Sequence, residues 1–311
     1  MDEYIYTFNR YLREEFGQRV HRISLDAGFN CPNLDGILDS QGCIFCNNRA
    51  FSRFRRLPPV SLEEQIIQGQ ASARQRFKAK RYIAYFQSFS NTYGNIEFLR
   101  KQYNLIRKFD DFVGIAISTR PDCIDQEKLD LIEEFSDDYK VYIEYGLQTV
   151  NDKTLKLINR KHTFSNFQSA IELTARRPNI NIGVHVILGL PGENKEAALE
   201  TAKVLANMPV WGVKFHALHI VKDTRLADMY QRYKIKLLSV NEYADILVSF
   251  LELLPETYVI LRLVSEADPK FLIAPAWVND KERAVRIIEA EFKRRRSSQG
   301  AFYKHIGTGP I

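Results

Sequence analysis

The sequence contains only four cysteines in 311 residues, and it has no long hydrophobic run and no low-complexity tract. Its longest apolar stretches, at 184–190 and 247–254, are far shorter than the ~20 residues of a membrane-spanning helix. The N-terminal residues, Met-Asp-Glu-Tyr-Ile-Tyr, have neither the basic nor the apolar region of a secretory signal peptide. We therefore expect a cytoplasmic protein with no membrane partner, in which clustered thiols bind metals or react rather than form disulfides.

The chain also lacks a large excess of one charge. It has 44 Lys and Arg against 38 Asp and Glu, which gives a formal net charge of +6 and an isoelectric point near 9.0. Such a balance is compatible with a polyanionic partner such as RNA, although a basic isoelectric point by itself mainly concerns solubility and non-specific binding. A hydrophobic content of 45% at this length allows one large α/β barrel or two modest domains.

Three of the four cysteines, Cys31, Cys43 and Cys46, lie within one short segment. Clustered thiolates select zinc or an iron–sulfur cluster. A closed zinc site and a four-iron cluster each need four ligands, so three cysteines leave one coordination position for another group. The segment is rich in Asn, Asp and Gly, which is typical of a loop and argues against ordinary buried thiols. Zinc with His21 as the fourth ligand is a second interpretation of this spacing.

Short β-branched or aromatic segments alternate with longer amphipathic segments over most of the chain. Repeated strand–helix units predict parallel strands joined by right-handed crossovers, and six such units predict a partial or full barrel. Ser61, followed by Glu64, predicts a capping box at the start of one helix. The predicted strands are 20–25, 82–87, 112–118, 141–147, 180–188 and 212–218, and the helices between them are 61–77, 96–108, 126–134, 164–175 and 195–207.

Polar or small residues follow each predicted strand. In barrels of this kind the active site is built at the C-terminal ends of the strands. The sequence therefore predicts one site at that end of the barrel, with the cysteine segment as part of it. The residues concerned are the 31–46 segment, Gln87 and Ser88, residues 119–122, Gln148 and Thr149, residues 189–193 and His219, with Glu144 and His216 inside two of the strands.

The alternation of strands and helices weakens after residue 222. Beyond it the pattern predicts helices at 241–254 and 281–296 and one strand at 258–263. We therefore divide the chain into an N-terminal segment (1–19), a core barrel (20–222) and a C-terminal extension (223–311) that covers the barrel or its open side. We expect residues 300–311 to be mobile.

Three motifs bring a known family into view: Glu144-Tyr-Gly-Leu-Gln148-Thr, Ile-Asn159-Arg160-Lys-His162 and Leu-Gly189-Leu-Pro-Gly192-Glu. They resemble the Elp3/MiaB-like branch of the radical S-adenosylmethionine (SAM) superfamily. Together with the cysteine segment, the strand that ends at Gln87 and the run Ser-Thr-Arg120-Pro-Asp-Cys123, the chain closely resembles the YhcC/YtqA-type subfamily over residues 20–275. The usual cysteine gaps of the superfamily are three and then two residues, whereas here they are eleven and two, in line with Elp3-like members, which lengthen the first gap.

The resemblance implies an α/β fold, a partial (βα)6 TIM-like barrel of the radical SAM type with a C-terminal α/β extension. It also implies two cofactors, a [4Fe–4S] cluster and SAM. Cys31, Cys43 and Cys46 would each hold one iron, and the amino and carboxylate groups of SAM would chelate the fourth. One-electron reduction would cleave SAM to a 5′-deoxyadenosyl radical that abstracts a hydrogen atom from the substrate. A flavodoxin or ferredoxin is then an expected electron donor.

The resemblance also suggests which residues contact SAM. Phe45 would lie near the adenine, and Gly189 and Gly192 would let the backbone approach it, since glycine has no Cβ. Arg120 would pair with the SAM carboxylate through its planar guanidinium, or form a salt bridge at the barrel mouth instead. The remaining cofactor-binding candidates are Gln87 and Ser88 for the methionine amino group and Glu144 and Gln148 for the ribose and carboxylate.

Catalytic candidates on the substrate side are fewer. His216 and His219 lie in or after a predicted strand, although a single inward histidine is often a core residue. Cys123, the remaining thiol, is either a redox residue or an inert, packed cysteine.

Relatives of the Elp3/MiaB type largely modify tRNA. The resemblance and the basic charge therefore favour a tRNA base as the substrate, and the suspected reaction is remodelling of a wobble-uridine side chain. The run Phe51-Ser-Arg53-Phe54-Arg55-Arg56 mixes aromatics and cations as RNA-binding surfaces do, and residues 293–296 either contact phosphates or complement a helix C-terminus. Methylthiolation and acyl transfer are disfavoured, because a second cysteine set and an acetyltransferase domain are lacking. The alternatives are a radical SAM enzyme for a small metabolite or peptide, and a zinc-bound, non-enzymatic nucleic-acid-binding protein.

Overall fold

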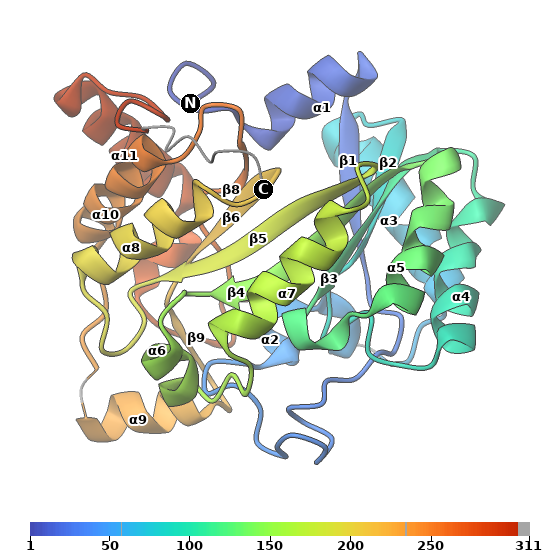
Figure 1. Ribbon diagram of the computed structural model, residues 1–311, viewed down its shortest axis with the longest axis horizontal. Helices are drawn as coiled ribbons and strands as arrows, with labels where there is room; N and C mark the ends of the chain where they lie inside the picture. The colour runs from blue at the N-terminus through green and yellow to red at the C-terminus, as the bar shows by residue number, and fades with distance from the viewer. Residues whose placement is uncertain (57, 234, 304–311) are drawn as a thin grey trace.

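A curved sheet of seven parallel strands forms the centre of the computed structural model, which describes residues 1–303 except residues 57 and 234 (Figure 1). The spatial order of the strands is β1-β2-β3-β4-β5-β6-β8. The predicted fold class, a partial barrel of the α/β type, is confirmed. The strands are β1 (Val20–Leu25), β2 (Arg81–Phe86), β3 (Phe112–Thr119), β4 (Lys140–Gln148), β5 (Ile180–Leu188), β6 (Gly212–Ala217) and β8 (Val259–Arg262).

Helices cover the convex side of this sheet, so that the concave side faces a lumen (Figure 1). The helices that connect the first six strands are α3 (Leu62–Phe77), α4 (Ile96–Asn104), α5 (Gln126–Glu133), α7 (Phe164–Ala175) and α8 (Lys195–Leu205). The capping box predicted from Ser61 and Glu64 is present at the start of α3. The remaining elements are α1 (Phe8–Phe16), α2 (Asn48–Phe51), α6 (Asp152–Leu157), α9 (Arg225–Tyr233), α10 (Val240–Leu253), α11 (Lys281–Arg295) and a small antiparallel pair, β7 (Ile220–Val221) with β9 (Leu272–Ala274).

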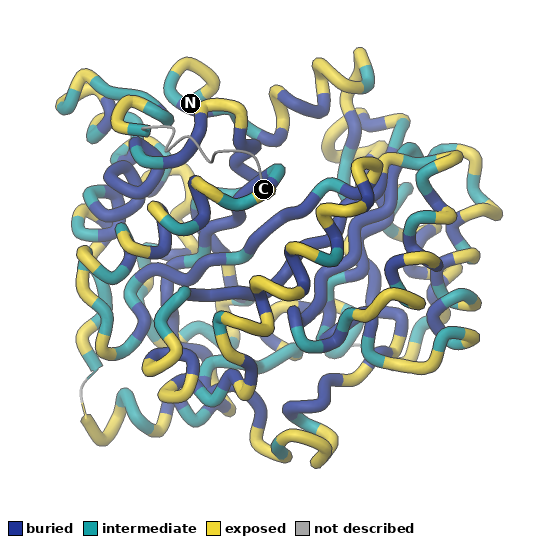
Figure 2. Tube along the Cα trace, in the orientation of Figure 1, coloured by how far each residue is buried: buried dark blue, intermediate teal, exposed yellow. Residues whose placement is uncertain are grey.

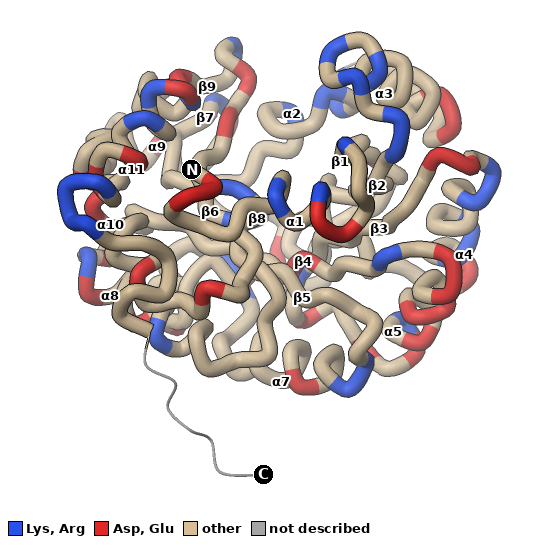
Figure 3. Tube along the Cα trace, turned by 90° about the horizontal axis from the view of Figure 1, so that it is seen from above, with Lys and Arg blue, Asp and Glu red and all other residues tan. Residues whose placement is uncertain are grey.

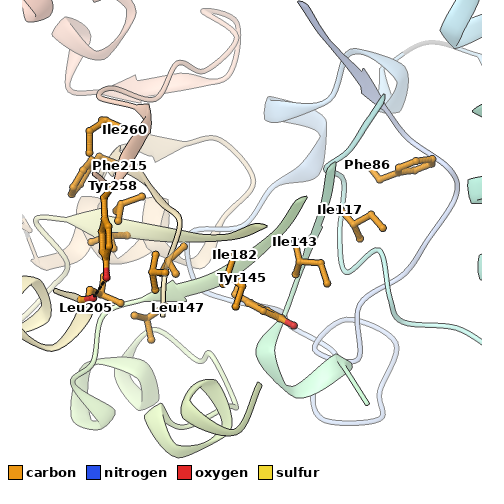
Figure 4. Packing of buried hydrophobic residues seen from close by; sticks show 14 of the residues in the cluster. Phe86, Ile117, Ile143, Tyr145, Leu147, Ile182, Leu205, Phe215, Tyr258 and Ile260 are labelled. Atoms are coloured by element: carbon orange, nitrogen blue, oxygen red, sulfur yellow. Dashed lines mark hydrogen bonds between the residues drawn. The ribbon is translucent and has the colours of Figure 1, made fainter. Parts of the chain in front are cut away.

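Alternation along each strand sends one set of side chains outward and the other into the lumen. The outward set forms the main hydrophobic core between the sheet and its helices, for example Ile117, Ile143 and Ile182 (Figure 4). Because both faces are covered, the strands are buried almost throughout, whereas the helices expose one side (Figure 2).

The lumen changes character along its length. At the N-terminal ends of the strands it is filled by apolar and aromatic side chains, with Tyr142 from β4 and Trp211 packed against Phe8 and Tyr11 of α1. Above this plug the inward residues of the strands become charged. The lumen is therefore closed at one end and can admit a ligand from the C-terminal ends of the strands.

The C-terminal extension takes part in the barrel as well as covering it. The predicted strand at 258–263 is β8, which pairs in parallel with β6 through Val213 and Ile260 and so widens the six-stranded barrel to seven strands. Helices α10 and α11 pack against each other beside it. No helix in the described ranges is both long and apolar enough to cross a membrane. Residues 304–311 of the predicted mobile tail lie outside the described part, and the prediction is not tested there.

Candidate functional site

The cysteine segment is a long loop at the C-terminal ends of the strands, on the side where α2, α6 and α9 lie (Figure 1). Its backbone is tied to two distant segments: the Ile44 N–H donates to the Ile158 carbonyl at 3.1 Å, and the Leu226 N–H donates to the Ile44 carbonyl at 2.8 Å. Cys31, Cys43 and Cys46 all line one cavity of about 140 Å³, here called the cysteine cavity. The structure thus brings together the three thiols that the sequence grouped.

Each of these sulfurs has a polar donor near it. The Cys43 Sγ accepts from Asn33 Nδ2 and from Arg160 Nη1, both at 3.5 Å. Asn48 Nδ2 lies 3.6 Å from the Cys46 Sγ, and Ser90 Oγ lies 3.7 Å from the Cys31 Sγ. Hydrogen bonds to the sulfurs are one means by which a protein tunes an iron–sulfur cluster. The donor set therefore suits thiolate ligands, which carry negative charge.

Burial, followed by the neighbouring thiols of Cys43 and Cys31, raises the pKa of Cys46 to about 12. A thiolate at this position needs a compensating positive charge, because Arg160 and Arg120 offset only part of the effect. Metal coordination supplies that compensation, since a coordinating thiol is deprotonated. The chemistry of the three thiols therefore fits a metal group in the cysteine cavity.

The arrangement does not fit a single zinc ion. Within the described residues, no group of three or more His, Cys, Asp or Glu side chains could hold one metal ion. His21, the proposed fourth zinc ligand, lies near the start of β1, stacks on Phe77 at 4.4 Å and lines a groove without any of the cysteines. The zinc interpretation with His21 is therefore wrong. A four-iron cluster needs no such convergence, because its three cysteines bind three different irons.

Arg120 is buried at the wall of the cysteine cavity. Its guanidinium makes two hydrogen bonds with Asp122, at 2.8 and 2.7 Å, and donates to the Arg160 carbonyl at 2.9 Å. The predicted alternative of a salt bridge at the barrel mouth is thus present. Its Nη1 is nevertheless buried without a partner, so one donor is still available.

Three of the predicted SAM-binding residues lie at the boundary between two cavities. They are Gln87, Gln148 and Phe45. All three line the cysteine cavity and also a second cavity of about 250 Å³ at the mouth of the lumen, here called the lumen cavity. Ser88 lines the lumen cavity only. Gln148 ends β4 with a φ of +78°, a left-handed conformation that is uncommon for residues other than glycine. These four candidates therefore line the two cavities at the end of the barrel where the cysteines lie, and their contacts with SAM stay a prediction.

Glu144 lies deeper than predicted. Its carboxylate accepts hydrogen bonds from Arg22 at 3.1 Å, Tyr85 at 2.8 Å and Lys214 at 2.7 Å, and contacts His185 at 2.6 Å. It lines neither of the two cavities. The carboxylate is occupied by these four side chains, so the geometry assigns it to holding the walls rather than to contacting the SAM ribose.

The predicted approach of Gly189 and Gly192 to the adenine stays a prediction, and the structure gives their conformation and surroundings. Gly189 and Gly192 have φ angles of +86° and +82°, which glycine adopts without strain. A Cβ at Gly189 would meet the Leu238 side chain at 2.9 Å, so this glycine makes room for a neighbouring loop. Neither glycine lines the cysteine cavity or the lumen cavity.

The three catalytic candidates differ in whether they line a cavity. Cys123 is buried, lines neither cavity, and burial raises the pKa of its thiol to about 12, which is the condition of an inert cysteine. His216 and His219 both line the lumen cavity. His216 accepts from Arg262 Nη2 at 2.8 Å, and burial lowers its pKa well below the usual value, so it is a neutral acceptor.

The basic segments predicted to bind RNA are partly used inside the protein. Arg55 makes two hydrogen bonds with Asp26, at 2.6 and 2.7 Å, and Arg56 pairs with Asp268 at 3.1 Å. Of the three arginines, Arg53 is the exposed one. In the 293–296 run, the half-buried Arg295 donates hydrogen bonds to Glu252 and Ser249 of α10. Positively and negatively charged residues are mixed along the Cα trace (Figure 3).

Several site residues escaped the sequence prediction. Arg160 contacts a cysteine sulfur, and its Nη2 donates to the Gly146 carbonyl at 2.7 Å; the signal was its place in the Asn159-Arg160 motif. Lys214 and Arg262 lie inside strands that were predicted correctly. A cation in an apolar strand is itself a signal, because buried Lys and Arg are rare unless paired.

Comparison with known families and proteins gives matches over most of the chain. The sequence model of the radical SAM superfamily matches residues 40–205, and that of the radical SAM C-terminal domain matches residues 210–294. Cys43 and Cys46 fall inside the first match, and Cys31 precedes it.

Individual relatives agree with these matches. Uncharacterized protein YtqA of Bacillus subtilis is 35% identical and aligns with 97% of this chain and 93% of its own length. Protein YhcC of Escherichia coli is 35% identical, with 87% of this chain and 86% of its own length aligned. A tRNA uridine(34) acetyltransferase of Dehalococcoides mccartyi is 22% identical over 62% of this chain and 42% of that protein. The solved structure of Elp3 from Methanocaldococcus infernus has the same fold, with a TM-score of 0.61 at 12% identity, over 90% of this chain and 64% of that one.

Proposed function

The chain belongs to the radical SAM superfamily, whose cofactors are a [4Fe–4S] cluster and SAM, and from this premise we propose that it modifies a base in tRNA. When bound, these cofactors supply a 5′-deoxyadenosyl radical that abstracts a hydrogen atom from the substrate. Cys31, Cys43 and Cys46 would each hold one iron of the cluster. The observation that carries the cluster chemistry of this proposal is that three thiols from one loop line one cavity, with a polar donor near each sulfur.

The walls of the cysteine cavity provide the contacts for SAM in this proposal. The free Nη1 of Arg120 would donate to the methionine carboxylate, and Gln87 would hold the amino group, with Ser88 near it in the lumen cavity. Phe45 and Gln148 line the passage from the cysteine cavity to the lumen cavity, which is the position for the nucleoside part. Together these residues would hold SAM at the mouth of the lumen, which the apolar plug closes at its other end.

The tRNA substrate is supported by similarity and by charge. A relative named as a tRNA uridine(34) acetyltransferase shares part of the chain, and the protein carries a net charge of +6. The lumen cavity of about 250 Å³ accommodates a small group or a base side chain rather than a folded partner. We propose that the group modified is a wobble-uridine side chain, with a flavodoxin or ferredoxin as the electron donor.

The same cavity size suits a second candidate, an enzyme acting on a small metabolite or a peptide side chain. The two candidates differ in whether RNA binds. Undermodified tRNA from a strain without this gene, incubated with reconstituted enzyme, SAM and reductant, should show a changed nucleoside by mass spectrometry. Absence of any nucleoside change together with absence of RNA binding would favour the small-molecule reading.

The cluster assignment is tested by Cys43→Ala, with Cys123→Ala as the matched control. Proteins purified without oxygen are assayed for iron and sulfide, and then for 5′-deoxyadenosine after reduction with SAM. We expect Cys43→Ala to lose SAM cleavage by at least ~100-fold, since a ligand is removed. Cys123→Ala should keep both cluster and cleavage, because its thiol lines neither cavity. Full SAM cleavage by Cys43→Ala would refute the assignment.

A further inference from the structure

The lumen holds a layer of charged side chains whose charges do not balance. Arg22 from β1, Lys214 from β6 and Arg262 from β8 point into it, and Glu144 from β4 is the buried carboxylate among them. The other polar members of the layer are Tyr85 and His185. Three cationic side chains thus face one buried carboxylate, and a buried charge without a partner costs free energy.

Glu144 is shared by two of the cations. It accepts from Arg22 and from Lys214, and Lys214 Nζ also donates to the Tyr85 hydroxyl at 2.5 Å. Arg262 is left without a carboxylate: within the described residues its guanidinium forms no ion pair, and its side-chain hydrogen bonds go to His216. Its Nε is buried with no hydrogen-bond partner. The excess positive charge is therefore located on the Arg262 side of the layer.

Part of this excess opens onto the lumen cavity, while Arg22 and Arg262 also line the groove of about 770 Å³ that His21 lines. Lys214, Arg262 and His216 all line the lumen cavity, next to Phe45 and Gln148 at the passage to the cysteines. Glu266 also lines the cavity, but it is exposed at the rim and faces Lys281 at 3.7 Å. The cations of the cysteine cavity, Arg120 and Arg160, are different residues and do not line the lumen cavity.

His219 adds a second kind of contact in the same cavity. Its Nδ1 donates to the Ala217 carbonyl at 2.9 Å, so the Nε2 of the neutral ring is an acceptor, and that atom is buried without a partner. Burial lowers the pKa of His219, which keeps the ring neutral. A ligand that pairs with these polar atoms therefore carries an anionic group next to Arg262 and, beside it, an N–H or O–H group that donates to His219.

We propose that the lumen cavity binds the group to be modified through an oxyanion, a carboxylate or a phosphate, held by Arg262 with Lys214, and through an adjacent hydrogen-bond donor held by His219. The proposal rests on the proposed function, because it assigns the lumen cavity to the substrate and the cysteine cavity to SAM. It deepens that function by defining the chemistry of the substrate: a neutral, unmodified base lacks the group that the cavity is built to hold.

The test uses the reconstituted, SAM-bound protein and three small probes: glycolate, its neutral amide glycolamide, and inorganic phosphate. Binding is measured by ligand-observed NMR for the wild type, Arg262→Gln, Arg262→Lys and the control Arg286→Gln on the exposed face of α11. We expect glycolate or phosphate to bind the wild type and glycolamide to bind at least ~10-fold more weakly. Arg262→Gln should weaken anion binding by ~10-fold or more, Arg262→Lys by less, and Arg286→Gln should leave it unchanged.

The outcomes separate the possibilities. Stronger binding of glycolate than of phosphate identifies a carboxylate, and the reverse identifies a phosphate. The comparison of glycolate with glycolamide uses the wild type alone, so the test stands even if an Arg262 variant fails to fold. Equal binding of glycolate and glycolamide overturns the proposal, as does a loss of SAM affinity in Arg262→Gln with anion binding intact. A wild type that cleaves SAM but binds neither anion refutes this inference alone, whereas failure to cleave SAM refutes the proposed function.

Discussion

At the scale of single residues, the site is built from side chains whose hydrogen-bonding capacity is only partly used. Arg120 keeps one buried donor free after binding Asp122, and Arg262 keeps its Nε free after binding His216. Folded proteins rarely leave buried polar atoms unpaired, so such atoms mark where a ligand is expected. Gly146 shows the opposite case: a Cβ there would lie 2.6 Å from Arg160 Nη2, so the glycine makes room for the arginine beside Cys43.

Lys214 is the residue from which we expect a pH dependence. Burial, with repulsion from Arg22 and Arg262, lowers its pKa to about 7, although Glu144 acts in the other direction. The groups facing it are Arg22 on β1, Tyr85 on β2, Glu144 on β4, His185 on β5, Arg262 on β8 and His216 on its own strand. Burial also lowers the pKa of His185 to about 4 and keeps His216 neutral, so Lys214 is the member of this set expected to titrate near neutrality.

The pKa of Lys214 determines whether anion affinity rises or falls with pH. Below pH 7 Lys214 is charged and attracts the anionic probe; as the pH rises through its pKa, the charge and part of the affinity are lost. We expect glycolate affinity to fall several-fold between about pH 6 and about pH 8.5, since one of the cations is neutralised. Lys214→Met should bind glycolate weakly at both pH values with a flat profile. A wild-type affinity independent of pH would contradict this assignment.

At the scale of elements, the junction between α10 and α11 shows how a basic run can serve structure rather than binding. Neighbouring arginines at the end of α11 have different surroundings. Arg295 donates to Ser249 at 2.8 Å and to Glu252 at 2.9 Å, and Glu252 is buried. Arg294 is exposed and pairs with Glu291, three residues earlier on the same helix. The sequence shows only consecutive arginines, and the helical rotation of about 100° per residue separates them.

We therefore expect Arg295→Ala and Arg294→Ala to differ in stability. Removing Arg295 leaves the buried Glu252 without its charged partner, which should lower the free energy of unfolding by ~3 kcal/mol. Arg294→Ala removes the same charge from the surface and should leave the unfolding midpoint in urea unchanged within error. Equal effects of the two substitutions would show that the ion pair with Glu252 does not hold α11 in place.

At the scale of the whole molecule, positively and negatively charged residues are mixed along the trace, so the proposed RNA binding would rely on a local patch (Figure 3). The exposed arginines beside the lumen cavity are Arg49 on α2 and Arg53 just after it, and neither forms an ion pair within the described part of the chain. Exposed Phe51 lies between them and lines that cavity, and Arg49 lies over the Phe271 ring at 6.0 Å. This set replaces the predicted patch, because Arg55 and Arg56 are engaged in ion pairs.

Replacing Arg49 and Arg53 together by Gln should weaken tRNA binding and reduce its dependence on salt concentration by up to about two phosphate contacts. The matched control replaces Arg283 and Arg286 on α11, which removes the same charge from exposed positions elsewhere. Affinity is measured by filter binding over a series of salt concentrations. If both double variants lose the same affinity, binding depends on net charge and not on this patch.

Most of the fold can be predicted from the amino-acid sequence. The hydrophobic pattern predicted the observed bounds of β1 and β5, and it predicted each end of the other sheet strands to within two residues. This works because the apolar side chains that face outward recur at a regular spacing within each strand. The sequence also grouped the three cysteines, which lie close along the chain. It missed the short helices α1, α2, α6 and α9, and it left β8 outside the barrel, since pairing between β6 and β8 joins residues that are far apart in sequence.

The contents of the lumen could not be predicted from the sequence, because they depend on how distant strands come together. Arg22, Glu144, Lys214 and Arg262 come from four strands, and nothing in the local pattern of any one strand shows that three cations face one carboxylate. The position of His21 could not be predicted locally either. Its spacing along the chain allowed it as a metal ligand, but in the structure the length of β1 separates it from the cysteines. Local sequence preferences determine where helices and strands form. The balance of charges in the lumen depends on side chains from distant strands, which meet only when the sheet curves.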